Sequence, residues 1–357
     1  MRRRYIKPNN LRVFLNDILA LLNIKDSVKF HLVESLILSS LRGVDSHGVP
    51  LFPHYVRALR AGRINGNPKY RFYRKAPSIG KLNADHTFGH AAGAEGMIKA
   101  MDLAKETGVG AVAVYNSSHF GAAAYYSLIA ANNDMIGISF THADSLLLTY
   151  NGKKAYFGTN PLCFAAPCKD EEPFCLDMAT SIVTWNKIKL YKERGKKIPR
   201  GVAANNKGRV TTIPSEIESL LPIGGYKGFG LSMMIDILCS LLTGMAFGRH
   251  IVSMYRDPIH KHRLLGHFFI AIDISCFEKI EVFKTRLKEM MDDVRAQPAV
   301  SSKKRIMVAG DPEKKCFAKR IVTGIPFEQK DIENFEKLAN EFNLKFSTYL
   351  SNEYEHP

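Results

Sequence analysis

The feature that most constrains the fold is a regular alternation of helical and strand patterns in residues 76–143. The segment APSIGKLNADHTFGHAAGAEGMIKAMDLAKETG (76–108) predicts a short strand, a turn, and a helix rich in alanine and methionine that stops at Gly108. VGAVAVYN (109–116) and MIGISFTHA (135–143) have the short apolar runs of strands, and HFGAAAYYSLIAANND (119–134) between them predicts a helix. Repeated strand and helix alternation is typical of an α/β domain.

Helical patterns dominate both ends of the chain. Apolar residues recur at helical spacing between Leu11 and Ser40, which predicts two helices. The last third contains a predicted strand, GHFFIAIDI (266–274), then an amphipathic helix over residues 278–293 and a closing helix over residues 328–343. No linker is long enough to separate independent domains.

Composition narrows the class of protein. With 357 residues, of which 46% are hydrophobic, the chain can bury a large core. No apolar run reaches the roughly 20 residues that a membrane span needs. The segment after the basic N-terminus carries Arg12, Asn16 and Asp17, where a signal peptide would be apolar. We therefore expect a cytoplasmic protein that does not bind a membrane.

The six cysteines lie in apolar contexts without C-x-x-C spacing, so neither a zinc site nor a disulfide framework is predicted, and no metal is expected. A net charge of +16 attracts anions of several kinds. Its basic clusters, KERGKKIPR and SSKKR, are short and lack interleaved aromatic residues, which is typical of solvated loops. Small anionic ligands are therefore favoured over nucleic acid.

Two glycine-rich segments were tested as phosphate-binding loops. Residues 108–113 fit G-x-G-x-x-A, but they follow a helix and enter a strand, whereas a dinucleotide loop follows a strand and opens a helix. We reject that match. PIGGYKGFGL (222–231) does open a helix, and its N-terminus together with Lys227 suits phosphate or carboxylate.

Four short polar segments are candidates for chemistry. They are DSHG with Ser46 and His47, SSHFG with His119, GTNP with Thr159, and DMATS with Asp177. His119 is predicted at the start of a helix after a strand, a place where α/β proteins put their sites and where a histidine tends to stay neutral. Each segment also has a structural interpretation: a helix end for His47 and His119, a turn for GTNP, a capping sequence for DMATS.

Taken in order, DSHG, SSHFG, GTNP, DMATS, PIGGYKGFGL, GHFFIAID and a late GIP make the chain resemble the type-2 malate/L-lactate dehydrogenase family from about Leu11 to Phe342. The resemblance implies a non-Rossmann, sulfolactate dehydrogenase-like α/β fold, with a mixed sheet flanked by helices. It also implies a helical domain from residues 1–75 and 312–357, and an NAD(P)-binding domain over residues 76–311 with a small inserted subdomain.

The resemblance further implies an oxidoreductase that interconverts a 2-oxo acid and a 2-hydroxy acid with NADH or NADPH, as a homodimer. The positive charge favours NADPH. The matching positions assign proton transfer to His119 and substrate contacts to Ser46 and His47. The resemblance also places Thr159 at the reacting centre. It assigns cofactor contacts to Asp177, Met178, Ala179 and Lys227 and, less directly, to Gly310 and Asp311.

One family residue is missing. Where the family commonly has arginine four residues after the DSHG histidine, this chain has Leu51, which cannot grip a carboxylate. Either another cation takes over, with Arg42, Arg57 and Arg60 as candidates and Arg42 as the assigned substrate contact, or the substrate is unusual. The alternative is a catalytically weakened NAD(P)-binding or interaction protein of the same fold.

Overall fold

The computed structural model describes residues 4–193, 195–301 and 304–350. Its centre is a seven-stranded mixed sheet in which β3 and β4 are parallel and the other neighbouring pairs are antiparallel. In order across the sheet, the strands are β2 (Arg71–Ala76), β3 (Ile79–Asn83), β4 (Val109–Ser117), β12 (Leu265–Asp273), β5 (Met135–Thr141), β8 (Leu162–Ala166) and β9 (Phe174–Met178). The predicted mixed sheet is confirmed.

Helices cover the two faces of the sheet unequally. On one face lie α4 (Gly89–Thr107) and α5 (Ala124–Ala131), and α4 approaches closely because Gly96 leaves room for Val114 and Phe269. On the other face, α7 (Tyr226–Asp236) continues into a π-helical turn, η4 (Ile237–Leu241). The alternation in β12 follows this arrangement: Phe269 packs in the cluster of α4, and Phe268 packs beside Cys239 of η4.

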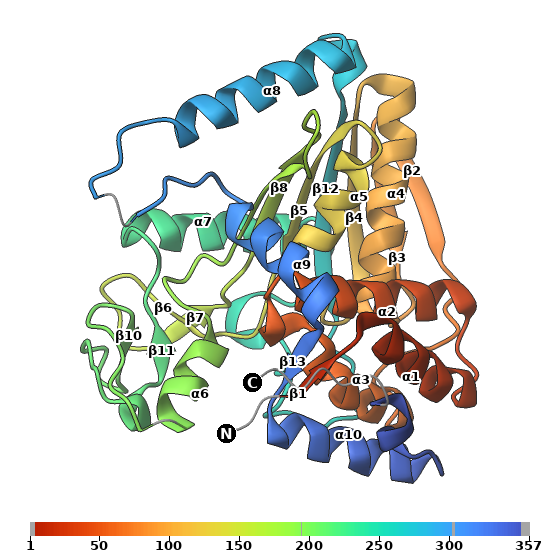
Figure 1. Cartoon of the computed structure of the whole chain (residues 1–357), viewed down its shortest axis with the longest axis vertical. Helices are drawn as coiled ribbons and strands as arrows, with labels where there is room; N and C mark the ends of the chain where they lie inside the picture. Colours follow the sequence, from red (N-terminus) through yellow and green to blue (C-terminus); the bar gives the residue numbers. More distant parts are fainter. Residues whose placement is uncertain (1–3, 194, 302–303, 351–357) are drawn as a thin grey trace.

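The two chain ends pack together below the sheet (Figure 1). They contribute β1 (Arg4–Ile6), α1 (Pro8–Leu21), α2 (Asp26–Leu41), α3 (Phe52–Arg60), α9 (Asp311–Thr323), β13 (Ile325–Phe327) and α10 (Gln329–Glu341). Strand β1 pairs with β13, and Phe14 packs against Phe335 and Phe346 in one hydrophobic cluster. This common core explains why helical patterns far apart in the sequence form one layer, although the exact domain boundaries stay a prediction.

A small lobe is inserted between β5 and α7. Its four-stranded sheet contains β10 (Ala203–Ala204), β11 (Ser219–Leu220), β6 (Leu147–Leu148) and β7 (Ala155–Phe157), in that order. Helix α6 (Trp185–Glu193) packs on it through Ile188. The long helix α8 (Ile280–Arg295) lies at the opposite end of the molecule from α1 and α10 (Figure 1). No helix within the described residues is long and apolar enough to cross a membrane.

Most predicted elements are confirmed, and the glycines at 108 and 110 have the structural role that led us to reject a dinucleotide loop. Gly108 ends α4 with a φ of +82°, and a Cβ on Gly110 would collide with the carbonyl oxygen of Ala100. Two placements were wrong. Helix α5 begins at Ala124 and not at His119, and Asp177 lies in strand β9 and not at a helix start.

Candidate functional site

The DSHG segment forms a short 3-10 turn, η1 (Asp45–His47), directly after α2. Arg320 of α9 holds Asp45 with two hydrogen bonds, the longer of which measures 3.0 Å. A side chain at Gly48 would collide with Ser40, whose hydroxyl accepts the backbone N–H of Val49 at 2.9 Å. These contacts fix the turn, and they explain why a short residue must follow the histidine.

His119 is placed by a loop between β4 and α5. The helix start at Gly89 passes so close to this loop that a Cβ there would collide with the carbonyl oxygens of Ser118 and His119. Behind the loop, His267 of β12 hydrogen-bonds to Ser117 at 2.8 Å and to Thr141 at 2.8 Å. The position of His119 is thus set from α4 on one side and from the sheet on the other.

The structure brings His119, His47 and Ser46 together with a tyrosine that the sequence analysis had not considered. The Tyr55 hydroxyl lies 2.7 Å from Nδ1 of His119, and the rings of His47 and His119 stack with centroids 5.5 Å apart. Ser46 Oγ lies 2.9 Å from Nδ1 of His47. Both histidines are partly exposed, whereas Tyr55 is buried. The two histidines thus lie on the accessible side of the cluster, and the tyrosine lies on its inner side.

The surrounding protein keeps these groups neutral. Burial, followed by the charges of His47 and Arg263, holds the pKa of His119 well below its usual range. Burial lowers the pKa of His47 to about 4 and raises the pKa of the Tyr55 phenol well above its usual range. Near neutral pH, His119 is therefore an unprotonated imidazole beside a protonated phenol. Helix polarity, which the sequence suggested, is not the cause, because His119 precedes α5 by five residues.

A buried arginine beside this cluster lacks partners for most of its guanidinium. Arg263 is 2% exposed and pairs through Nη2 with Asp144, which also accepts hydrogen bonds from Ser253 and the backbone of Met254. Its Nε and Nη1 have no hydrogen-bond partner among the described residues. Buried donors are rarely left unpaired, so these two point to an anionic ligand that the guanidinium receives.

A second fully buried group, His90, also lacks partners. Neither ring nitrogen has a hydrogen bond within the described part of the chain. The His90 ring meets the Tyr55 ring edge-on, with centroids 4.8 Å apart. Gly121, which has a φ of +76°, packs so close that a Cβ on it would lie 2.9 Å from Nε2 of His90. Burial, followed by the charge of His47, lowers the pKa of His90 to about 3. The proton-transfer cluster therefore rests on a neutral, buried imidazole.

Asp177, Met178 and Ala179 lie at the end of β9, on the far side of the loop that carries His119. Asp177 Oδ2 accepts the backbone N–H of Ala124 at 2.9 Å and so caps α5. The carboxyl is open to solvent, yet protein surrounds it on most sides and raises its pKa to about 6. An accessible carboxyl with a raised pKa is a candidate for contact with a ligand.

Gly310 lies against the same strand. It has a φ of +96°, and a Cβ there would come within 3.1 Å of the carbonyl oxygen of Cys175 in β9. The carboxylate of Asp311 is engaged by Arg295, with contacts of 2.6 and 3.0 Å, and Arg295 holds its pKa below the usual range. The close approach of Gly310 brings this segment next to Asp177, and Asp311 anchors it to α8.

The other predicted residues are distributed between these two groups. The backbone oxygen of Thr159 accepts from both the N–H and the hydroxyl of Thr180 at 2.8 Å, which joins GTNP to DMATS. Arg42 is 4% exposed and donates to Glu172 at 2.9 Å, and its charge acts on Asp177. Arg42 thus lies on the Asp177 side of the site.

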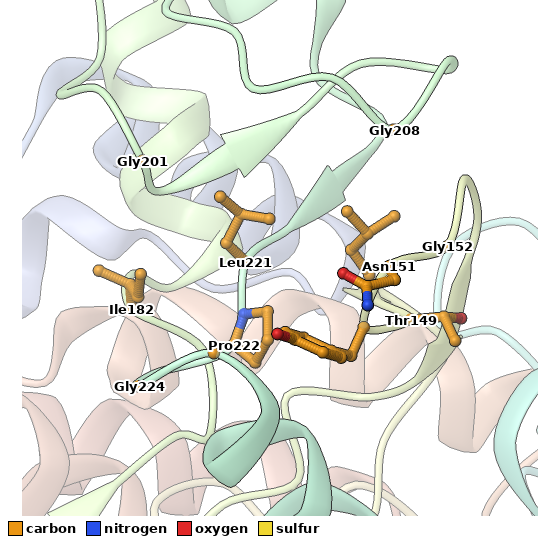
Figure 2. Close-up of a pocket in the computed structure, with 12 residues that line it drawn as sticks. Thr149, Asn151, Gly152, Ile182, Gly201, Gly208, Leu221, Pro222 and Gly224 are labelled. Carbon is orange, nitrogen blue, oxygen red and sulfur yellow. The ribbon is translucent and has the colours of Figure 1, made fainter.

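Lys227 is an exposed residue in the first turn of α7, and no ion pair to it occurs within the described residues. Gly224 and Gly225, which precede it, line a cavity of about 370 Å³. Ile182 and Pro222 form one part of its wall, and Thr149 and Asn151 form another (Figure 2). Its lining residues place the cavity at the small lobe, between the DMATS segment and the predicted anion site. None of the histidines described above lines it.

Sequence reasoning missed Tyr55, Arg263 and Asp144. Tyr55 is eight residues beyond His47, and no local pattern distinguishes it. Arg263 meets Asp144 across 119 residues of sequence, so only the fold shows their pairing. Within the residues that the structure describes, no group of three or more His, Cys, Asp or Glu side chains is arranged to hold a metal ion.

Comparisons with known proteins show the family and the fold of this chain. Residues 6–336 match the model of the family described as malate/L-lactate dehydrogenase. A malate dehydrogenase of Pyrococcus abyssi is 38% identical over 87% of this chain and 88% of its own. A malate/(S)-sulfolactate dehydrogenase of Methanothermus fervidus is 33% identical over 96% and 99%. The crystal structure of malate dehydrogenase from Entamoeba histolytica superposes with a TM-score of 0.91 at 30% identity, covering 96% of this chain and 99% of the other.

Proposed function

The chain belongs to the malate/L-lactate dehydrogenase family, and we propose that it transfers a hydride between NAD(P)H and a 2-oxo acid, with the 2-hydroxy acid as the reduced form. One observation carries the proposal. A neutral, accessible histidine lies beside a buried guanidinium that has two unpaired donors. The first group can move a proton and the second can bind a carboxylate, which is what this reaction needs from the protein.

His119 is the proposed proton acceptor. The Tyr55 hydroxyl can accept the Nδ1 proton of the ring, which leaves the Nε2 lone pair free for the hydroxyl proton of the substrate. In the reducing direction, the same nitrogen returns the proton to the carbonyl oxygen. Tyr55 is thus a positioning residue that selects the tautomer of His119.

Arg263 is proposed to take the role of the family arginine, whose position is occupied by Leu51 in this chain. Of the arginines, it is the first that acts on the pKa of His119, whereas Arg42 acts on Asp177 and Arg60 pairs with Glu341 on the surface. With Nη2 held by Asp144, the free Nε and Nη1 can each donate a further hydrogen bond to an anion. Leu51 therefore gives no reason to assume lost activity, and the alternative of a weakened binding protein has no support. Ser46 and His47 are proposed to contact the same substrate.

The second group of residues suits a nicotinamide cofactor. Asp177, Met178 and Ala179 offer polar and apolar groups close to Gly310, and Lys227 at the N-terminus of α7 supplies an unpaired positive charge for phosphate. When bound, the cofactor would donate or accept the hydride. The surplus of positive charge favours NADPH, and Thr159 is proposed to lie between the two halves of the site.

The test is turnover of a panel of 2-oxo acids, followed through the absorbance of NADH and, separately, NADPH. His119→Ala should keep cofactor binding, measured by fluorescence, and lose turnover by roughly 10²–10⁴-fold. His260→Ala, a change at an exposed histidine that has no side-chain hydrogen bond or ring contact within the described residues, is the matched control. Equal turnover in the His119→Ala and wild-type proteins would refute the assignment, and cofactor binding without turnover of any 2-oxo acid would refute the proposed reaction.

We also propose that the chain acts as a homodimer in the cytoplasm. An exposed apolar surface on α7 and η4 supports the dimer; its members Met233, Met234, Ile237 and Leu241 are between 41% and 58% exposed. Two buried cysteines, Cys163 and Cys175, lie 3.7 Å apart with unbonded thiols, which is usual for a reducing compartment. The mass in solution from light scattering checks the dimer, and cell fractionation checks the location.

A further inference from the structure

Helix α6 of the small lobe reaches the substrate side of the site through two residues on one of its faces. Asn186 donates to the backbone oxygen of Ser46 at 3.3 Å, next to His47. Lys189, one helical turn further on, places its ammonium 4.9 Å from the centre of the Tyr255 ring. The lobe is therefore joined to the catalytic side of the molecule by a hydrogen bond and a cation–π contact.

The Tyr255 ring leads back toward His119. It packs against His54 with centroids 5.2 Å apart, and His54 in turn packs against Tyr55 at 5.9 Å. Tyr255 is 60% exposed, so the ring forms an outer wall and not part of the core. Lys189 stands at the open end of this wall, and Tyr55 stands at its inner end beside His119.

Positive charge exceeds negative charge along the wall. Burial, followed by the charges of Arg63, Arg57 and Arg263, lowers the pKa of His54 to about 4. Asp144 is engaged by Arg263, and Arg63 donates to backbone oxygens of the loop that carries Tyr255. Within the described residues, neither Lys189 nor Arg57 has a carboxylate in ion-pair contact. Lys189 of α6 contacts the Tyr255 ring, and Arg57 of α3 follows His54, another partner of that ring, by about one helical turn, so the two cations flank this wall.

We propose that Lys189 and Arg57 form an outer anion subsite, which binds the negatively charged tail of a 2-oxo acid whose other end reacts at His119. This inference rests on the proposed function, since it assigns the selectivity of the same site. It divides the recognition of a dianionic substrate between two places. Arg263 receives the carboxylate beside the reacting carbon, and the subsite receives the second charge.

We expect the subsite to favour substrates with longer anionic tails. Lys189 has a long flexible stem, while its helix is tied to Ser46, so the ammonium can approach the site without movement of the lobe. An anionic tail of several atoms can meet it more readily than a short one. A neutral tail of the same length gains nothing from the two cations, so an acid and its amide are the suitable pair of probes.

The experiment compares kcat/KM for 2-oxoglutarate with kcat/KM for 2-oxoglutaramate, in which an amide replaces the tail carboxylate and the carboxylate beside the keto group remains. The pair is repeated with oxaloacetate and the corresponding amide of its tail. The wild-type protein should favour the acids. Lys189→Ala should lower the acid-to-amide ratio about three- to fivefold, as an exposed ion pair allows, with the larger effect on the longer acid. Lys189→Arg should keep the ratio, and added salt should lower it more in the wild type than in Lys189→Ala, where Arg57 alone remains.

Lys187→Ala is the matched control, because Lys187 is an exposed lysine of the same helix with no recorded contact to Tyr255. Equal ratios in Lys189→Ala, Lys187→Ala and wild type would overturn the subsite while leaving the proposed reaction intact. A wild-type protein that turns over neither acids nor amides would instead refute the proposed function. The two failures are therefore distinguishable in one set of assays.

Discussion

The buried, unpartnered imidazole of His90 makes the stability of this protein depend on pH in a way that can be isolated. In the folded chain its pKa is lowered to about 3, whereas a histidine in the unfolded chain has the ordinary value of 6.5. Below that ordinary value, the unfolded chain binds a proton that the folded chain refuses. The contribution of His90 is therefore constant above about pH 6.5, and stability is lost as the pH falls from there toward about 3.

The size of the loss follows from the difference between the two pKa values. Each pH unit inside that window costs about 1.4 kcal/mol of unfolding free energy per group, so His90 alone costs about 2 kcal/mol between pH 7.5 and pH 5. Solvent screening does not reduce this figure, because His90 is 0% exposed. His90→Leu removes the titration and also two unpaired nitrogens, so it should not destabilise the protein at neutral pH.

The assay is urea unfolding of wild type and His90→Leu at about pH 7.5 and about pH 5, at one fixed protein concentration. The loss of unfolding free energy between the two pH values should be about 2 kcal/mol smaller in the variant. His260→Leu, a change at an exposed histidine, should lose as much as the wild type. If His90→Leu and wild type lose equal stability on acidification, the buried histidine is not the source of acid sensitivity.

Two further predictions concern the catalytic side. Tyr55→Phe removes the partner of Nδ1 on His119 and should lower kcat for oxidation of the hydroxy acid about tenfold with little change in KM, which steady-state kinetics would show; a large rise in KM with kcat intact would contradict the positioning role. Arg263→Lys keeps the charge beside Asp144 but loses the additional guanidinium donors, so KM for the 2-oxo acid should rise about tenfold or more. Arg42→Lys should leave this KM nearly unchanged. The reverse ranking would return the carboxylate to Arg42.

Local sequence patterns predicted the elements well because their signals are local. The helix that Gly108 ends, the strand over residues 109–117 and the helices of both chain ends depend on apolar spacing and on residues at their boundaries. The start of α5 was misplaced because Ala122 and Ala123 of the His119 loop are good helix formers and lead directly into the helix. Only the carboxylate of Asp177, which caps Ala124 from another strand, defines where that helix begins.

The sequence by itself determined the α/β class, the family and the segments that hold the site, since motif order and apolar periodicity are properties of the chain. The tertiary structure alone decided which groups act together. Arg263 meets Asp144 over 119 residues of sequence, Tyr55 meets His119 over 64, and the pKa shifts of the histidines arise mainly from burial. Burial and long-range contacts exist only when the chain is folded. The sequence alone therefore could not identify Arg263, proposed to act in place of the missing arginine, or Tyr55, proposed to orient His119.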